Sequence, residues 1–337
     1  MTERRRDPLS GEWRTFAVHR QDRTFLPPAD LCPLCPTRDP ARPTEIAEPS
    51  FDIVVFDNRF PALVADPPQP VTTSTPLYPT EPALGAAEVV VYTDRHDATL
   101  AHLGRDRIRQ LIEVWADRYR ILGARQGVRY VFVFENKGEA VGVTLHHPHG
   151  QIYAYPEIPP RVLSHLREAQ RHLEANGTCV VCDVVARELS DEVRLVAQNR
   201  TFLAFVPFAP RFPYELRVVS HRHATSLLDL TDRERADLAA LLDQVLPGYD
   251  SLFGFSLPYV MSLHQAPTDE AHWLPVSHLQ FEFTPLHRTA TKLKYMAGSE
   301  LGAGAFINDT YPEQTAAHLR AAVIQAAGGR YGSTASG

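Results

Sequence analysis

The chain has 337 residues, 44% of them hydrophobic and 22% charged, which is typical of a globular protein with one large domain or two ordinary ones. Its formal net charge of −6 gives no basic footprint for nucleic acid. No apolar run is long enough to span a membrane, and the start Met-Thr-Glu-Arg-Arg-Arg-Asp lacks the apolar core of a signal peptide. We expect a cytoplasmic protein without nucleic-acid or membrane partners.

The first elements in the chain are strands separated by irregular segments. A short strand is predicted at 14–18, and buried-strand patterns follow at 51–56 and 88–92. Between them, six prolines interrupt residues 66–82. This segment is predicted to be a long irregular loop, either a solvated insertion or a flap near a functional site.

All four cysteines fall into two Cys-x-x-Cys pairs, Cys32/Cys35 and Cys179/Cys182. In a reducing compartment this spacing indicates a metal knuckle or a redox centre rather than structural disulfides. A redox dithiol should lie between a strand and the start of a helix. The first pair is instead flanked by prolines, and no helical pattern follows it, so zinc ligation is the better interpretation.

Helical periodicity predicts an amphipathic helix at 105–123, which a strand at 130–134 follows. The next segment, 143–154, reads Val-Thr-Leu-His-His-Pro-His-Gly-Gln-Ile-Tyr-Ala. If it is extended, His147, His149 and Gln151 share one face, because alternate residues of a strand point the same way. The competing interpretation is a histidine-rich surface turn, since proline and glycine interrupt the run.

The second half of the chain repeats the order of elements in the first. A helix at 161–175 leads to the second knuckle, and Asn199-Arg200 echoes Asn58-Arg59. Strands at 215–219 and 259–263 flank a helix that Thr231 and Glu234 open with a capping box. The ordered repeat predicts two tandem α+β modules, at 1–175 and 176–330, with antiparallel sheets, helices packed on one side and a flexible tail at 331–337.

Each module offers the four ligands of a closed tetrahedral zinc site. The first set is Cys32, Cys35, His96 and His147, and the second is Cys179, Cys182, His223 and His278. Any single histidine here could instead be an ordinary surface or core residue, but two parallel sets make that interpretation weaker. Because both coordination shells are closed, the two predicted zinc ions are structural rather than catalytic.

With His147 bound to zinc, His149 remains as the reactive group of the first module. A neutral imidazole is a good nucleophile toward phosphorus and leaves readily from a phosphoramidate, which suits covalent catalysis. The second module has Gln280 at the equivalent position, and glutamine cannot perform this chemistry. The sequence therefore predicts one competent module and one that serves as scaffold.

The run His-Pro-His-Gly-Gln at 147–151, preceded by Phe-Glu-Asn-Lys-Gly at 134–138, resembles the galactose-1-phosphate uridylyltransferase family of the histidine-triad superfamily. The similarity extends over 4–23, 55–65 and 293–309. The resemblance implies two histidine-triad-like modules and ping-pong transfer of a uridylyl group from UDP-glucose to galactose 1-phosphate, as in galactose metabolism.

The resemblance also implies roles for individual residues. His149 would be the nucleophile, and Gln151 would hydrogen-bond the phosphoryl oxygens. Contacts to the nucleotide or phosphates would come from Arg20, Asn58, Asn136, Gly142 and Thr144. A segment that in the family reaches the hexose phosphate, often across a homodimer interface, is matched by Lys294, Tyr295 and Glu300.

Several positions depart from the family pattern and leave alternatives open. Arg59 stands where some relatives have an acidic residue near the ribose. Some relatives carry a second metal site, described as iron, of which only His264 and His278 are matched, while Gln280 replaces another ligand. The second cysteine pair instead resembles relatives with two zincs, among them an ADP-sugar phosphorylase, which is the second hypothesis.

A third hypothesis is a non-catalytic, zinc-stabilised nucleotide-binding module. A protein that only binds nucleotides needs no imidazole at either of these equivalent positions. The histidine retained at 149, with glutamine at 280, therefore speaks against this hypothesis.

Overall fold

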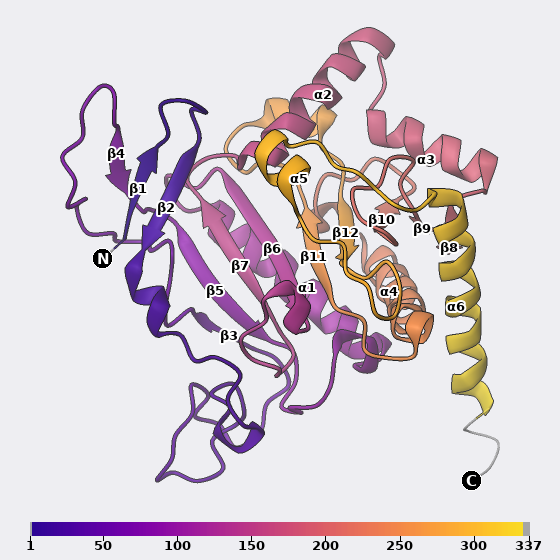
Figure 1. Ribbon diagram of the computed structural model, residues 1–337, viewed down its shortest axis with the longest axis horizontal. Coiled ribbons are helices and arrows are strands. Elements are labelled where there is room, and N and C mark those ends of the chain that lie inside the picture. Colours follow the sequence, from indigo (N-terminus) through magenta and orange to yellow (C-terminus); the bar gives the residue numbers. More distant parts are fainter. Residues whose placement is uncertain (1, 333–337) are drawn as a thin grey trace.

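The computed structural model describes residues 2–332 and is built around one nine-stranded antiparallel sheet (Figure 1). The first half of the chain contributes β3 (Val54–Asp57), β5 (Ala86–Val91), β6 (Tyr130–Lys137) and β7 (His149–Tyr155). The second half contributes β8 (Leu195–Gln198), β9 (Phe202–Phe205), β10 (Leu216–Ser220), β11 (Tyr259–His264) and β12 (Gln280–Pro285).

The two halves of the sheet are related by an approximate internal twofold. The strand order β3-β5-β7-β6 is followed by the mirrored order β11-β12-β10-β9, with β8 added at the edge, and β6 and β11 pair antiparallel. His149 lies opposite Val91, as Gln280 lies opposite Val219, so His149 and Gln280 are equivalent. The predicted α+β class with two antiparallel modules is confirmed. The sequence did not indicate that their sheets join into one.

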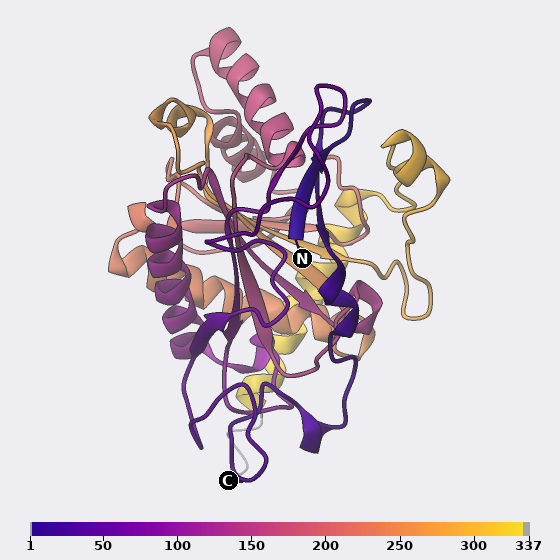
Figure 2. The same ribbon diagram turned by 90° about the vertical axis from the view of Figure 1, so that its left-hand side faces the viewer.

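Two long helices cover one face of the sheet. Helix α1 (Arg105–Gly123) has the predicted bounds, and its buried residues recur at helical spacing. Helix α4 (Asp232–Phe253) begins with the predicted capping box, in which Glu234 N–H donates to Thr231 Oγ1 at 3.3 Å and Thr231 N–H donates to Glu234 at 2.8 Å. Figure 2 shows these helices on one side of the sheet and the N-terminal strands on the other.

The N-terminal strands form a small sheet of their own, in the order β2-β1-β4. Its members are β1 (Thr2–Arg6), β2 (Trp13–Ala17) and β4 (Thr80–Pro82). Arg4 is buried and forms ion pairs with Glu81 and Glu157. The end of the proline-rich segment, predicted to be irregular, is therefore strand β4, which pairs with β1 through Arg4 and its neighbours.

The remaining helices surround the second module. They are α2 (Pro160–Asn176), α3 (Val180–Asp191), α5 (Gly298–Ala303) and α6 (Pro312–Gly332). The helix predicted at 161–175 is α2, whereas α3 was not predicted and begins within the second cysteine pair, with Cys179 at its N-cap. Of the predicted flexible tail, residues 333–337 lie outside the described residues. Among residues 2–332, no helix combines the length and the apolar character needed to cross a membrane.

One predicted echo does not hold in space. Asn58 and Arg59 follow β3, the strand that pairs with β5, whereas Asn199 and Arg200 precede β9, the strand that pairs with β10. The two Asn-Arg pairs are thus not equivalent under the internal twofold. They share only local structure, since Asn58 Oδ1 and Asn199 Oδ1 both accept nearby backbone N–H groups.

Candidate active site and metal centres

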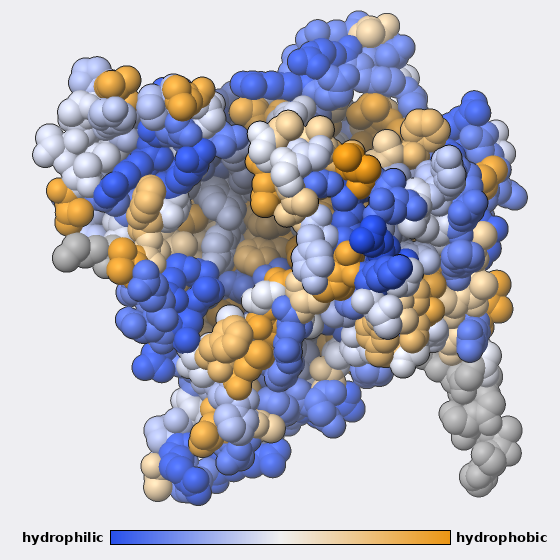
Figure 3. Space-filling model, in the orientation of Figure 1, coloured by the Kyte–Doolittle hydropathy of each residue, from blue (hydrophilic) through white to orange (hydrophobic). Residues whose placement is uncertain are grey.

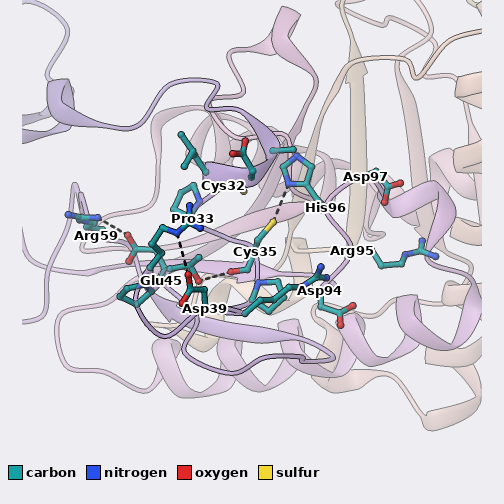
Figure 4. Close-up of a pocket in the computed structure, with 18 residues that line it drawn as sticks. Cys32, Pro33, Cys35, Asp39, Glu45, Arg59, Asp94, Arg95, His96 and Asp97 are labelled. Carbon is teal, nitrogen blue, oxygen red and sulfur yellow. Dashed lines mark hydrogen bonds and ion pairs between the residues drawn. The ribbon is translucent and has the colours of Figure 1, made fainter.

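The first predicted metal set lies together in the structure. One ligand atom from each of Cys32, Cys35, His96 and His147 lies within 4.8 Å of all the others. Cys35 Sγ is 3.4 Å from His96 Nδ1 and 3.5 Å from His147 Nδ1, and Figure 4 shows Cys35 pointing toward His96. His147 Nε2 donates to the Thr93 carbonyl at 2.7 Å, which leaves Nδ1 as the ligand atom facing the cysteines.

The second predicted metal set repeats this arrangement. Ligand atoms of Cys179, Cys182, His223 and His278 again lie within 4.8 Å of one another. Cys182 Sγ is 3.7 Å from Nδ1 of each histidine. His278 Nε2 donates to the Ser220 carbonyl at 3.0 Å, so a backbone carbonyl orients this imidazole as well.

Both clusters have the donor chemistry that a zinc ion requires. Burial, followed by the neighbouring Cys32, raises the pKa of Cys35 to about 12, and burial with Cys179 raises the pKa of Cys182 to about 11. A bound dication reverses this effect, because it stabilises paired thiolates. Burial lowers the pKa of His147 to about 4, which keeps its imidazole neutral, as a metal ligand must be.

The position of His149 depends on the residues behind its strand. His149 begins β7 and lies opposite Val91. The N–H of Tyr92 donates to the Pro148 carbonyl at 3.1 Å, and a Cβ atom on Gly150 would lie 2.2 Å from the Tyr92 hydroxyl. Only glycine lets the buried Tyr92 ring pack this closely behind the strand, so the glycine of the motif has a packing role.

The protonation of the His149 ring follows from one hydrogen bond. Nδ1 lies 2.8 Å from the His147 carbonyl oxygen, which can only accept, so Nδ1 carries the hydrogen and Nε2 keeps its lone pair. Across the described residues, no hydrogen bond engages Nε2. Burial lowers the pKa of His149, so the ring is neutral near pH 7. The carbonyl would also stabilise the positive charge that the ring gains when Nε2 forms a bond.

A pocket opens beside His149 and contains three further residues predicted from the sequence, Asn58, Thr144 and Gln151. Asn58 Oδ1 accepts the Phe60 N–H at 2.9 Å, which leaves its amide NH₂ free to donate. The rest of the lining combines apolar side chains with two arginines, one glutamate and one threonine: Pro33, Leu34, Phe56, Phe60, Val89, Leu145, Arg23, Arg59, Glu45 and Thr24. Apolar walls with a few placed polar groups and cations suit a ligand with a base, a sugar and phosphates.

Other predicted nucleotide contacts lie near this pocket but not in its wall. Arg20 Nη1 donates to the Phe60 carbonyl at 2.8 Å, so its guanidinium is already partly engaged. Gly142 is exposed in a left-handed turn at φ 81°. Asn136 lines an adjoining cavity that also reaches His149.

The sequence did not assign a role to Arg23, which lines the pocket. The segment that carries it is held by the Leu26 N–H, which donates to the Thr144 carbonyl at 2.8 Å. No local sequence pattern predicts a contact between residues as far apart in the chain as Leu26 and Thr144. The only signal was the pair of basic residues, Arg20 and Arg23, before the first knuckle.

The predicted hexose-phosphate residues lie apart from the pocket. Lys294 Nζ donates to Glu300 at 2.7 Å, with both side chains buried, and this contact lowers the pKa of Glu300 to about 2. Tyr295 is 70% exposed. In Figure 2 the segment around α5 projects from the body of the molecule, and none of the three residues lines the pocket at His149.

The face of the sheet that α1 and α4 leave uncovered carries a concave region. Figure 3 shows a hollow on this face, between the N-terminal strands and the α5 segment. Protein ligands commonly bind in such concave regions.

Comparison with known proteins gives matches over nearly the whole chain. Family models described as the N-terminal and C-terminal domains of galactose-1-phosphate uridyl transferase match residues 1–159 and 165–327. A galactose-1-phosphate uridylyltransferase of Thermotoga maritima is 38% identical over 325 residues, covering 96% of this chain and 100% of the relative. One from Streptomyces lividans is 35% identical, covering 95% and 86%.

Solved structures give the same result. A uridylyltransferase structure that is 38% identical superposes with a TM-score of 0.85 and covers 96% of this chain and 99% of its own. An ADP-glucose phosphorylase of Arabidopsis thaliana with bound ADP-glucose is 25% identical, with a TM-score of 0.72 and coverage of 95% and 99%.

Proposed function

This chain belongs to the galactose-1-phosphate uridylyltransferase family, and on that premise we propose that it transfers a uridylyl group from UDP-glucose to galactose 1-phosphate through a covalent intermediate on His149. The observation that carries the proposal is the free Nε2 of a neutral, half-buried imidazole in the wall of a pocket that Asn58, Thr144 and Gln151 also line.

The reaction exchanges one sugar phosphate for another in two steps. Nε2 of His149 attacks the α-phosphorus of UDP-glucose, the phosphoanhydride P–O bond breaks, and glucose 1-phosphate leaves. A phosphate oxygen of galactose 1-phosphate then attacks the same phosphorus, the N–P bond breaks, and UDP-galactose leaves. Each step is a substitution at phosphorus, so no oxidant or reductant is needed, and the His149 ring is neutral again at the end.

Three pocket residues have suitable chemistry for the phosphoryl oxygens and the nucleoside. The Gln151 amide would donate to the oxygens, and Tyr153 Oη already contacts Gln151 Oε1 at 3.4 Å, which orients that amide. Arg23 supplies positive charge at the pocket rim. The Asn58 amide would donate to the nucleoside. Such preorganised donors stabilise the charge that spreads over the oxygens in the transition state.

We further propose that both Cys₂His₂ clusters bind zinc with a structural role. The support is the donor set, the mutual distances and the oriented histidines. His147 belongs to the cluster and also accepts the His149 Nδ1–H through its carbonyl. Ligation of His147 would therefore fix the backbone that holds the nucleophile.

The hexose-phosphate role of Lys294, Tyr295 and Glu300 is proposed for a homodimer. The segment that carries them exposes several large apolar side chains: Tyr295, Met296, Leu301, Ile307 and Tyr311. A second copy of the chain would bury this surface and bring the segment to the partner's pocket.

ADP-sugar phosphorolysis is the second candidate. It is supported by the structural likeness to an ADP-glucose phosphorylase and by Arg59, which pairs with Glu45 at 3.0 Å at the pocket rim. This reaction would use the same covalent step on His149, with inorganic phosphate as the acceptor.

Product analysis separates the two candidates. The enzyme is incubated with UDP-glucose or ADP-glucose, each offered galactose 1-phosphate or phosphate. We expect UDP-galactose and glucose 1-phosphate from the first pairing. Formation of ADP from ADP-glucose and phosphate at a much higher rate would favour the second candidate, and no product from any pairing would contradict both.

A further inference from the structure

A second cavity lies in the C-terminal module, on the face that the internal twofold relates to the pocket at His149. Its volume is about 210 Å³, and its walls include Arg217, His264, Gln265 and Gln280. Helix α2 lies along one side, with Val162, His165, Leu166 and Ala169 among the lining residues. The cavity shares no lining residue with the pocket at His149, and it adjoins the second metal set through His278.

The strand register shows how the two faces differ. In the first module Gln151 lies opposite Val89, and in the second Glu282 lies opposite Arg217. Arg217 therefore replaces Val89, a wall residue of the first pocket, and Glu282 replaces Gln151. An apolar wall position has become cationic, so the second cavity is not suited to the same nucleoside.

Glu282 feels the charge of Arg217, but among the described residues its hydrogen bonds come from other arginines. Arg161 donates to both of its oxygens, at 2.7 and 2.8 Å, and Arg211 donates to it at 2.9 Å. The nearby Glu215 accepts the backbone N–H of Arg211 at 2.9 Å. Glu168 also lines the cavity and pairs with Arg171. Arg217 thus faces the cavity with unengaged hydrogen-bond donors rather than with an excess of positive charge.

Several buried polar atoms along the cavity have no hydrogen-bond partner among the described residues. They include Nε of Arg217, Nε2 of Gln265 and Nε2 of His264. Gln265 is 4% exposed and His264 8% exposed. Gln265 Oε1 accepts the Leu227 N–H at 2.9 Å, which identifies its free atom as the amide donor. The Arg217 and Gln265 atoms are donors, and because unpaired buried donors are costly, the two of them at one cavity call for an acceptor.

We propose that this cavity is a second anion site, which takes a phosphate-sized oxyanion, either inorganic phosphate or the phosphoryl group of a hexose 1-phosphate. Arg217 and the Gln265 amide donate to its oxygens, and Gln280 supplies a third donor from the position that His149 occupies in the first module. The site binds without chemistry, since glutamine forms no bond to phosphorus. This inference is independent of the reaction proposed at His149.

The test compares Arg217→Gln with Arg233→Gln in the full-length, zinc-containing protein. Arg233 is exposed on α4, so its substitution changes the net charge equally and leaves the cavity unaltered. Inorganic phosphate is titrated calorimetrically into each protein, and thermal unfolding is followed with and without phosphate. Phosphate binding in the pocket at His149 contributes equally to every protein, so the difference reports the second cavity.

We expect phosphate affinity at the second site to fall by about tenfold or more in Arg217→Gln, because a hydrogen bond to a charged group is lost, and to stay unchanged in Arg233→Gln. Phosphate should raise the unfolding temperature of the wild type more than that of Arg217→Gln. Equal phosphate binding by the wild type and Arg217→Gln would overturn the proposal. The cavity would then hold only water.

Two further arms make the test complete. Gln280→Met removes a donor without removing a charge and should also weaken phosphate binding, so a folding defect in Arg217→Gln would not end the test. Glucose 1-phosphate in place of phosphate distinguishes the two ligand sources. The ligand whose affinity falls in Arg217→Gln relative to the wild type, whether phosphate or glucose 1-phosphate, is the one that occupies the site.

Discussion

The two modules share a strand order and a Cys₂His₂ cluster, yet only the first has a histidine at the position proposed for the nucleophile. His147 and His278 occupy equivalent positions and both contact a backbone carbonyl through Nε2. Two residues later the modules diverge, with His149 in one and Gln280 in the other. In the proposed account the cluster fixes the start of each strand, and the residue two positions after the cluster histidine determines whether the module can form a bond to phosphorus.

The layer behind the two strands differs in a compensating way. Gly150 lies in front of Tyr92 in the first module, and the register places Phe281 and Ser220 at the same two positions in the second. In the first module the small residue is Gly150 and the large one is Tyr92. In the second module the large residue, Phe281, takes the place of Gly150, and the small one, Ser220, takes the place of Tyr92. Equivalent backbones are therefore supported by opposite choices of side chain.

A third difference is a buried carboxyl group. Glu135 on β6 is 3% exposed, and burial raises its pKa to about 8. Its equivalent on β11 is Leu263, which is fully buried. The first module therefore holds a titratable group behind its active strand where the second holds an ordinary core residue.

The largest expected effect is the loss of activity on replacing the nucleophile. His149→Asn should lower the rate of nucleotidyl transfer by roughly 10⁴-fold or more, because neighbouring groups cannot form a bond to phosphorus in its place. Gln280→Ala should retain activity within a few-fold. Equal losses in both variants, measured by steady-state kinetics, would show that the modules do not differ as described.

Each module should bind one zinc ion. Elemental analysis of protein purified without added metal should give about two zinc equivalents, since closed Cys₂His₂ sites bind tightly. Cys32→Ser and Cys179→Ser should each lose about one equivalent, and Cys32→Ser should lose more activity because its cluster contains His147. A single equivalent that Cys179→Ser leaves unchanged would remove the second site from this account.

Gly150→Ala should destabilise the fold by about 2 to 3 kcal/mol, since the new Cβ overlaps a well-packed hydroxyl. Tyr92→Phe removes that hydroxyl. Chemical unfolding of the two single variants and the double variant forms a cycle, in which alanine should cost less in the Tyr92→Phe background. Additive losses would mean that another contact, such as the Phe134 carbonyl 3.1 Å from the same Cβ, sets the limit.

The last expected effect is a change in the pH dependence of stability. The folded-state pKa of Glu135, about 8, is raised from 4.5, so the folded protein keeps a proton that the unfolded chain releases between these values. Stability should therefore fall as pH rises through this window, by about 1 kcal/mol per pH unit. Tyr92, Lys137 and Tyr259 face the carboxyl group.

Glu135→Gln has no proton to release, so its free energy of unfolding should decline less between pH 6 and 8 than that of the wild type. Urea titrations at both ends of the range measure the difference. Identical slopes would indicate that Glu135 is already ionised in the folded protein at pH 6.

Sequence reasoning succeeded where spacing alone carries the information. The helix at 105–123 and both ligand sets follow from local periodicity or from paired motifs, and the structure places these residues as the patterns predicted. The twofold relation between His149 and Gln280 followed from the same repeat. Local spacing or the internal repeat reveals these features, even where residues such as Cys35 and His147 meet across a long stretch of chain.

The features that were missed depend on pairing between distant segments. Strand β1 is rich in charged residues, and Arg4 is buried only because Glu81 and Glu157 approach it from elsewhere. Arg23 reaches the pocket through the contact between Leu26 and Thr144. The Asn199-Arg200 echo misled for a similar reason, since a repeated dipeptide does not reveal which strand its neighbours pair with.

The most direct test of the central claim is covalent labelling of the chain. Incubation with α-³²P-labelled UDP-glucose, without an acceptor, should leave an acid-labile, alkali-stable label that galactose 1-phosphate discharges as UDP-galactose. The label should be absent in His149→Asn and present in Gln280→Ala. Product formation at an undiminished rate in His149→Asn would mean that transfer is direct, and it would contradict the assignment of His149 as nucleophile.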